Sequence, residues 1–199
     1  MKLLYACCLC LWACTAQAQS VSITRTVNRT ATSPAHDAYH LDEQPGAGVA
    51  WLRLPPFHTG TVTFEVKGKD VLQGSFVGMA FHGSNDSTYD VVYLRPFNFR
   101  AADPVRRSHA VQYICLPKYD WELLRNEHPG KYEASLDPAP AAEDWVKVKL
   151  VVTAKQVTTF VNGQQVLQVD LLGNVRTGTQ LGLWVGNTSG GDWRNVKVL

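Results

Sequence analysis

Two glutamates and two histidines are the candidates for acid–base chemistry in this chain: Glu65, Glu133, His82 and His109. A carboxyl group and an imidazole can each donate or accept a proton in a positioned site. A retaining glycosidase mechanism needs two carboxyl groups about 5–5.5 Å apart, and adjacent strands can supply them. Glu133 and Glu65 are therefore the candidate acid–base residues, and His109 is a candidate proton partner. A lone carboxylate is more often solvated or salt-bridged than catalytic, so both interpretations stay open.

A second group of side chains suits a polar, ring-shaped ligand. Arg, Gln, Asn and His offer directional hydrogen bonds, and Tyr and Trp offer flat rings. The small Gly78 and Ala80 leave room between them for such a ligand. The alternative is that these side chains form the solvated face that any antiparallel sheet presents. The candidate ligand-binding residues are Tyr93, Arg95, Asn98, Gln112, His82, Trp121 and Arg125.

The elements that must position these side chains are β-strands, because polar and apolar residues alternate along much of the chain. Neighbouring side chains in a strand point to opposite faces of the sheet. The segment Thr61–Val66 alternates without a fault, so Glu65 faces away from the apolar Phe64 and Val66. The same rule turns further candidates away from the core: His82, Tyr93, Arg95 and Gln112. We therefore expect a polar groove on one face of a sheet and an apolar interior on the other.

Many short alternating segments separated by Gly, Pro, Asn and Asp are typical of an antiparallel sandwich or barrel. The pair Asn162-Gly163 predicts a two-residue hairpin turn, because both residues tolerate positive φ. The expected strands are Val21–Val27, Val49–Leu54, Thr61–Val66, Phe76–His82, Asp90–Arg95, Ala110–Leu116, Val146–Thr153, Val157–Val161, Gln165–Asp170, Leu181–Val185 and Arg194–Leu199.

The segment Pro117–Asp144 lacks the strand pattern and contains a predicted helical turn around Trp121–Asn126. A connection of this length inside a domain is usually either functional or disordered. Its aromatic and charged side chains, Trp121, Arg125 and Glu133 among them, argue against disorder.

The first residues have the features of a secretory signal peptide: a positive start, an apolar run over Leu3–Ala13 and an Ala-x-Ala ending at Ala18. We expect a signal peptide at residues 1–18, one domain at 19–199, and a secreted or periplasmic protein. The alternative is cleavage before Cys14, which would leave a lipid anchor on that residue. Cys115 is the one cysteine after Ala18, so no internal disulfide is expected in the mature chain.

The charge of the chain is nearly balanced, with 19 Lys and Arg residues against 17 Asp and Glu residues. No basic stripe of the kind that binds phosphate backbones is present in the sequence, so a nucleic-acid partner is not expected. No segment after the signal peptide is long and apolar enough to predict a membrane span. The oligomeric state cannot be predicted from these patterns.

No cofactor is predicted. His36 and His40 are four residues apart, which would suit a metal on a helix, but no helical pattern supports them. Asp70 and the segment Asn85-Asp86-Ser87 offer oxygen atoms that could hold a structural calcium ion, although they lack a calcium-loop signature and read as turns.

Several segments resemble the family known as the 3-keto-disaccharide hydrolase-type domain of unknown function. They are Tyr93–Phe99, Arg106–Tyr113, Leu124–Glu133, Trp184–Asn187 and Ser189–Trp193. The resemblance implies an all-β fold, a concanavalin-A-like jelly-roll β-sandwich of two antiparallel sheets, related to laminin-G-like modules and laminarinase-type glycosidases. Such glycosidases carry a Glu-x-Asp-x-x-Glu pattern on one strand, and this sequence contains no Glu-x-Asp.

Three functions are compatible with these patterns. The first is binding of a glycoside or polysaccharide in a polar groove. The second is a hydrolase or lyase of glycosides or keto-sugars, with Glu133 or Glu65 as the acid–base and Arg95 stabilising developing negative charge. The third is a structural adhesion module. The contents of the groove should separate them, because a carboxyl–histidine pair there favours the enzyme.

Overall fold

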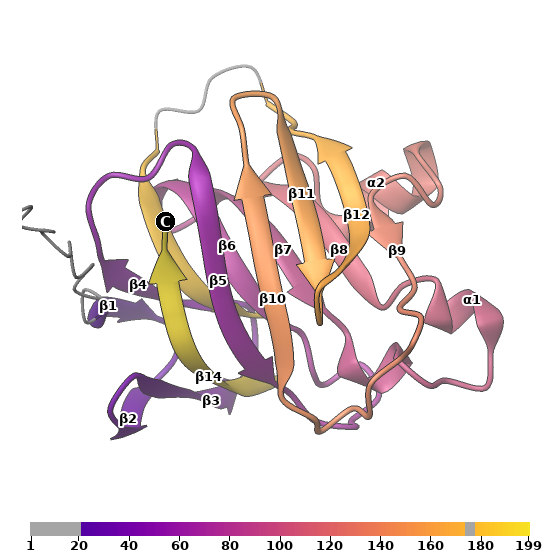
Figure 1. The fold of residues 1–199 in the computed structure, drawn as a ribbon, viewed down its shortest axis with the longest axis horizontal. Coiled ribbons are helices and arrows are strands. Elements are labelled where there is room, and N and C mark those ends of the chain that lie inside the picture. Colours follow the sequence, from indigo (N-terminus) through magenta and orange to yellow (C-terminus); the bar gives the residue numbers. More distant parts are fainter. Residues whose placement is uncertain (1–20, 174–177) are drawn as a thin grey trace, which may run out of the picture.

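Two antiparallel sheets of seven strands each face one another in the computed structural model, which describes residues 21–173 and 178–199 (Figure 1). The expected jelly-roll β-sandwich is therefore confirmed. The predicted signal peptide, including Cys14, lies outside the described residues.

The first sheet has the strand order β1-β4-β13-β6-β7-β8-β9. Its members are far apart in sequence, so the sheet forms only when distant segments meet. Its strands are β1 (Ser22–Val27), β4 (Gly48–Arg53), β6 (Val77–Asn85), β7 (Thr88–Leu94), β8 (Val111–Leu116), β9 (Glu133–Ala134) and β13 (Gln180–Val185).

The second sheet has the order β12-β11-β10-β5-β14-β3-β2 and lies toward the viewer in Figure 1. Its strands are β2 (Ala31–Ala35), β3 (Ala38–Gln44), β5 (Gly60–Lys67), β10 (Val146–Val152), β11 (Gln156–Val161), β12 (Gln164–Asp170) and β14 (Ser189–Val198). In β10, Val146 and Val148 are buried while Lys147 and Lys149 are exposed. This alternation shows that one face of the second sheet packs on the core and the other faces solvent.

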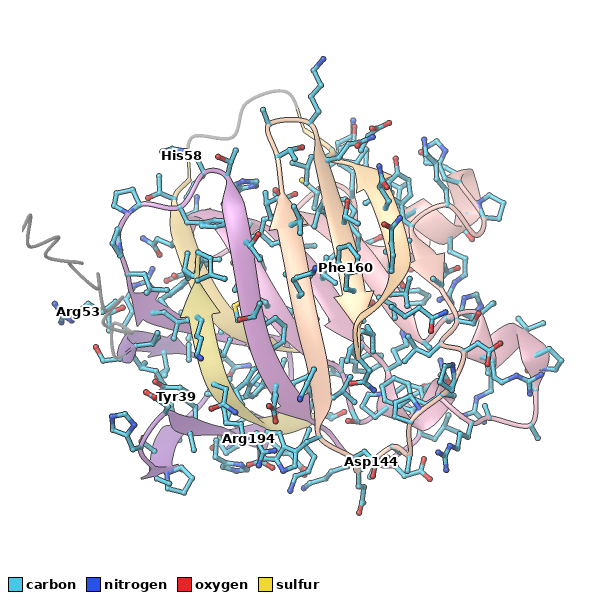
Figure 2. All side chains as sticks on the ribbon, viewed as in Figure 1. Tyr39, Arg53, His58, Asp144, Phe160 and Arg194 are labelled. Carbon is cyan, nitrogen blue, oxygen red and sulfur yellow. The ribbon has the colours of Figure 1, made fainter. Side chains whose placement is uncertain are left out.

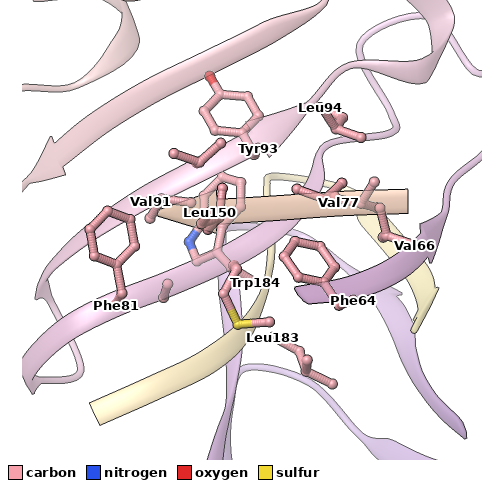
Figure 3. Packing of buried hydrophobic residues seen from close by; sticks show 14 of the residues in the cluster. Phe64, Val66, Val77, Phe81, Val91, Tyr93, Leu94, Leu150, Leu183 and Trp184 are labelled. Carbon is pink, nitrogen blue, oxygen red and sulfur yellow. The ribbon is translucent and has the colours of Figure 1, made fainter. Parts of the chain in front are cut away.

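The core lies between the sheets and is made of aliphatic and aromatic side chains from both. Phe64 and Leu150 from the second sheet belong to the same cluster as Val77 and Phe81 from the first (Figure 3). Each of these side chains is at most 3% exposed. Full burial of a side chain of this size stabilises the fold by about 1.5–3 kcal/mol.

The turn at Asn162-Gly163 connects β11 to β12 as predicted. Both residues have positive φ, 50° and 89°. Val161 and Gln164 are directly paired across the turn. A two-residue loop with this backbone follows the right-handed twist of the strands, which explains the Asn-Gly sequence.

The eleven expected strands are all present, with shifted ends, and three further strands were not predicted. In β2, Pro34 and mostly exposed side chains hide the pattern, which suits an edge strand. In β3, the buried Tyr39 and Leu41 do alternate with more exposed residues, so this signal was missed. The third, β9, has two residues, too few for any period to be visible.

The strands β6 and β7 differ from the second sheet because they are buried on both faces. Every residue of β6 from Val77 to Gly83 is buried, as is Tyr89–Leu94 of β7. The outer face of the first sheet is therefore covered, and the cover comes from segments outside the strands. These include η1 (Pro96–Asn98), α1 (Pro104–Arg107) and α2 (Trp121–Glu127), the last of which matches the predicted helical turn.

The helices of the described residues are short, and none of them is long and apolar enough to cross a membrane.

Candidate functional site

A row of five residues crosses the first sheet in direct register and defines the site. Trp184 is paired with Gly78, Gly78 with Tyr93, Tyr93 with Gln112, and Gln112 with Glu133. Side chains at paired positions point to the same face of a sheet, here the outer face. Figure 3 shows the Tyr93 hydroxyl pointing away from Phe64 of the core.

Gly78 allows the two large rings of the row to come together. A Cβ atom at this position would lie 2.2 Å from the carbonyl oxygen of Val92 and 2.6 Å from Cα of Tyr93. With no side chain there, the rings of Tyr93 and Trp184 approach to 5.0 Å between centroids. The sequence predicted room for a ligand at position 78, and the structure fills that space with the neighbouring rings.

Arg95 follows β7 and extends along the row, where it forms a buried hydrogen-bond network. Its Nη1 donates to the carbonyl of His109 at 3.0 Å, and its Nη2 donates to the Tyr93 hydroxyl at 2.8 Å and to Oε1 of Gln112. The residue is 4% exposed. An arginine that is fixed in this way offers a rigid positive charge to whatever lies in front of it.

Glu133 at the end of the row is surrounded by three basic side chains. Arg125 donates from Nε to Oε1 at 3.2 Å and from Nη2 to Oε2 at 2.9 Å. Nδ1 of His109 lies 2.8 Å from Oε2, off the line of a good hydrogen bond, and Nη1 of Arg95 lies 3.8 Å from the same oxygen. Both carboxylate oxygens are thus occupied by the protein itself.

A cavity of about 630 Å³ opens in front of this network, on the outer face of the first sheet. Its walls are mostly apolar, with a few polar groups among them. This combination is usual for a small-molecule site. The cavity is lined by Ala47, Leu72, Gln73, Phe76, Tyr93, Arg95, Phe97, Asn98, Arg106, His109, Ile114, Leu116, Asp120, Trp121, Arg125, Trp184, Gly186 and Asn187.

Burial governs the ionisation of the groups in the wall. It raises the pKa of Tyr93 to about 12, so the phenol stays protonated. It lowers the pKa of His109 below the usual 6.5, and the neighbouring Arg125 and Arg95 act in the same direction, against the attraction of Glu133. His109 is therefore a neutral imidazole at pH 7. Burial also lowers the pKa of Arg95, and a guanidinium remains protonated in proteins.

Six of the residues proposed from the sequence meet at the cavity wall: Tyr93, Arg95, Asn98, His109, Trp121 and Arg125. Gln112 and Glu133 lie directly behind them in the hydrogen-bond network. Trp121 is 45% exposed, whereas Tyr93 and Gln112 are at most 2% exposed. The sequence predicted an open polar groove, and the structure instead has a cavity with mainly apolar walls under covering segments.

Glu65 does not line this cavity. The prediction that Glu65 and Glu133 could lie close enough to act as a pair of carboxyl groups is therefore wrong. Glu65 belongs to β5 in the second sheet, and Glu133 belongs to β9 in the first. Burial opposes ionisation of Glu65, but hydrogen bonds from Arg194 at 2.8 Å and Asn195 at 3.2 Å prevail and lower its pKa. Arg194 lies on the face turned to the viewer in Figure 2. Glu65 is a salt-bridged surface residue.

His82 is also displaced from the predicted groove. It has φ of 52°, at a bulge where the β6–β7 register shifts, so the alternation of the strand fails there. Its Nδ1 lies 2.7 Å from Oδ2 of Asp90, and its Nε2 donates to the carbonyl of His58 at 2.8 Å. The imidazole fastens the segment before β5 to β6 and β7 and does not line the cavity.

A tryptophan in an apolar strand such as Leu181–Val185 is expected to lie in the core, and for Trp184 that interpretation is incomplete. It is 5% exposed, yet it lies on the outer face and lines the cavity. The alternation around it, with Leu183 and Val185 facing the core, was the signal that could have placed it. Phe97 and Arg106 were missed because they lie outside regular strands. Phe76 was missed although it is the first residue of the predicted strand Phe76–His82.

Residues weighed as metal ligands from the sequence, and set aside there, have other partners. His40 Nδ1 lies 2.8 Å from Oδ1 of Asp192, and His36 Nδ1 lies 3.2 Å from Oδ2 of Asp37. Asp86 accepts a hydrogen bond from the indole of Trp51 at 2.9 Å and pairs with Arg25. Within residues 21–173 and 178–199, no three His, Cys, Asp or Glu side chains form a group suited to a metal ion.

Comparisons with solved structures identify the fold at low sequence identity. The carbohydrate-binding module CBM66 from Bacillus subtilis matches with a TM-score of 0.63 and 12% identity, over 90% of this chain and 94% of that chain. A Bacillus subtilis protein of unknown function with a galectin-like fold matches with a TM-score of 0.57 and 16% identity, over 87% of both chains. A prokaryotic β-1,3-1,4-glucanase (lichenase) derived from a mouse hindgut metagenome matches with a TM-score of 0.50 and 13% identity, over 87% and 76%.

No family model and no curated protein matches the sequence. At identities this low, the structural matches establish a shared β-sandwich architecture alone. The function must therefore be argued from the site.

Proposed function

We propose that this protein binds carbohydrate in the cavity on the outer face of its first sheet. One observation carries the proposal: Trp121 and Trp184 line the same cavity as the guanidinium groups of Arg95 and Arg125. Aromatic rings can cover the apolar faces of a sugar, while fixed donors bind its hydroxyl groups. The volume of about 630 Å³ lies within the usual range for a ligand site.

Trp121 gives the cavity an accessible ring at its rim. The indole is 45% exposed, and the guanidinium of Arg125 stacks on it at 5.1 Å from the ring centroid. An exposed aromatic ring loses little solvation and little conformational freedom when a ligand stacks on it. Nε and Nη2 of this arginine hold Glu133, and its Nη1 has no hydrogen-bond partner among the described residues, so Nη1 can reach a hydroxyl group from the same side.

The fold is consistent with this proposal by analogy alone. One matching structure is named as a carbohydrate-binding module and another as a β-1,3-1,4-glucanase. We extend the proposal to export of the protein, on the signal-peptide pattern ending at Ala18. Membership of the 3-keto-disaccharide hydrolase-type family is likewise proposed, on the segments that resemble it.

A catalytic function is the second candidate, and the His109–Glu133 pair favours it. A neutral imidazole in the cavity wall, with a carboxylate 2.8 Å from its Nδ1, is an arrangement that can hold a general base in place. Glu133 itself is less suited to be the proton donor, because Arg125 holds both of its oxygens. The reaction would be hydrolysis or elimination of a glycoside or keto-sugar.

The test is a glycan array followed by calorimetric titration of each glycan that binds. Trp121→Ala should weaken binding by about tenfold, the scale of one stacking interaction. Trp145→Ala is the matched control, because Trp145 stacks with Lys67 and Arg194 of the second sheet, away from the cavity. Equal binding by both variants and the unaltered protein would contradict the proposal.

Incubation of the bound glycans with the protein, followed by chromatography of the products, separates binding from catalysis. Turnover that is lost in His109→Gln while affinity persists would favour the enzyme. Intact glycans after prolonged incubation would favour a binding module.

A further inference from the structure

The charged groups around the cavity do not balance. Three arginines line it, Arg95, Arg106 and Arg125, whereas Asp120 is the one carboxylate in the lining. Glu133 behind the wall supplies a second negative charge. His109 adds no charge at neutral pH because burial lowers its pKa. The described residues around the cavity therefore leave one positive charge in excess.

Arg95 and Arg125 share the single carboxylate of Glu133. Arg125 holds both carboxylate oxygens, and Nη1 of Arg95 remains 3.8 Å from Oε2. The other acid, Asp120, uses Oδ1 to accept the backbone N–H of Leu123 at 2.8 Å, at the start of α2. Among the described residues, no carboxylate is within hydrogen-bond distance of the Arg95 guanidinium.

A buried charge without a full partner is costly, especially beside apolar walls. The side chain of Arg95 is 5% exposed and that of Glu133 is 3% exposed. The cavity is mostly apolar, so water screens this excess charge less than at an open surface. A negatively charged group of a ligand would remove the cost.

Gln112 supplies an unused donor in the same network. Its Oε1 must face Arg95, because a guanidinium can only donate, and this orientation leaves Nε2 pointing elsewhere. Nε2 is buried and has no hydrogen-bond partner among the described residues. A buried donor normally has an acceptor. Gln112 is 1% exposed, so its unpaired Nε2 lies in the interior, in the same network as Arg95 and Tyr93.

We infer that the carbohydrate bound here is acidic, a sugar that carries a carboxylate group directed at Arg95 and Arg125. This inference rests on the proposed function. Arginine is the side chain best matched to a carboxylate, because its planar donors can bind both oxygens. Arg106 completes the basic wall, since its Nε donates to Asn98 at 3.2 Å and its Nη2 to the carbonyl of Phe97 at 2.8 Å, with no carboxylate among these partners.

The experiment is a calorimetric titration of the full chain with trimers of galacturonate, glucuronate and mannuronate. Each acid is compared with its methyl ester, which keeps the shape of the sugar and removes the charge. At least one acid should bind ten times more tightly than its ester or better. Raising the salt concentration should weaken binding of the acid more than binding of the ester.

Arg125→Gln should reduce the preference for that acid over its ester to less than about threefold. Lys131→Gln is the control, because it removes the same charge from an exposed residue that does not line the cavity. Arg106→Gln is the second variant, since Arg106 does not contact Glu133 and its loss leaves that ion pair intact. Thermal unfolding of each variant establishes that it is folded before titration.

Acids and esters that bind equally well would overturn the inference and leave the proposed function standing. So would a preference that survives both Arg125→Gln and Arg106→Gln. If neither these trimers nor the neutral glycans of the array bind, the proposed function fails and the inference fails with it.

Discussion

Arg125 and Glu133 form a two-pronged ion pair, with Nε and Nη2 of the arginine 3.2 Å and 2.9 Å from the two carboxylate oxygens. The pair joins α2, a covering element, to β9 at the edge of the first sheet. Because β9 has only two residues, backbone pairing alone holds it weakly. The ion pair is therefore a structural link that also fixes one wall of the cavity.

Glu133→Gln should lower the stability of the protein by about 2 kcal/mol, because hydrogen bonds to charged groups contribute more than neutral ones. For a domain of this size the melting temperature should fall by roughly 4–8 °C. Differential scanning calorimetry measures this fall. Glu127→Gln is the control, because Glu127 is an exposed residue of α2, the helix that carries Arg125. This variant should leave the melting temperature nearly unchanged. Equal melting temperatures for the two variants would show that the ion pair contributes little.

Arg95→Ala should destabilise the protein by about 3 kcal/mol or more, because it leaves three acceptors of a buried network without their donor. Those acceptors belong to His109, Tyr93 and Gln112. Urea denaturation followed by tryptophan fluorescence gives the free energy of unfolding. Arg100→Ala serves as the control, since Arg100 is exposed and donates to one carbonyl, that of Ala139. A loss at Arg95 no larger than at Arg100 would mean that the network is not formed in solution.

Stability should fall as the pH drops below about 6.5, the ordinary pKa of histidine. The folded protein lowers the pKa of His109, so in this range the unfolded chain binds a proton more readily than the folded chain does. The contribution of neutral His109 is fully present above the unfolded pKa and is lost progressively below it. His109→Gln should flatten the curve of melting temperature between pH 7.5 and 5 compared with the unaltered protein. A steeper curve for the variant would contradict the assigned direction.

Gly78→Ala should cost about 3 kcal/mol or more, because its Cβ would lie 2.2 Å from the Val92 carbonyl oxygen and 2.6 Å from Cα of Tyr93. Near-ultraviolet circular dichroism should change as the rings of Tyr93 and Trp184 separate. Gly130→Ala is the comparison, because no atom lies within 4 Å of its Cβ and only its positive φ of 74° opposes the change. Its cost should stay near 1 kcal/mol, and a similar loss at both positions would exclude crowding as the cause.

The sequence predicted the facing of Tyr93 and Gln112 correctly, because alternation along a strand is a local property. It could not predict that these side chains are covered, since the cover comes from segments such as α2 and residues 72–76, which have no strand period. Glu65 shows a second limit. Alternation along β5 predicted correctly that Glu65 faces away from the core. It carried no information on which sheet β5 joins, and the sheet decides whether Glu65 can contact Glu133.

His82 marks a third limit. A bulge with positive φ breaks the period of two at a single residue, and no feature of the sequence around it announces the break. Trp184 is the reverse case, where the alternation was present and a preference for burying tryptophan in the core obscured it. Position in the sheet, not residue type, placed its ring at the cavity.

The two sheets present very different surfaces to their surroundings. Lys147 and Lys149 are exposed on the outer face of the second sheet, while the cavity opens on the outer face of the first. Amine coupling through these lysines would attach the protein to a bead or sensor chip with its opposite side directed to the solution. The mouth of the cavity would then face the solution, so the proposed glycan binding could be measured on an immobilised layer.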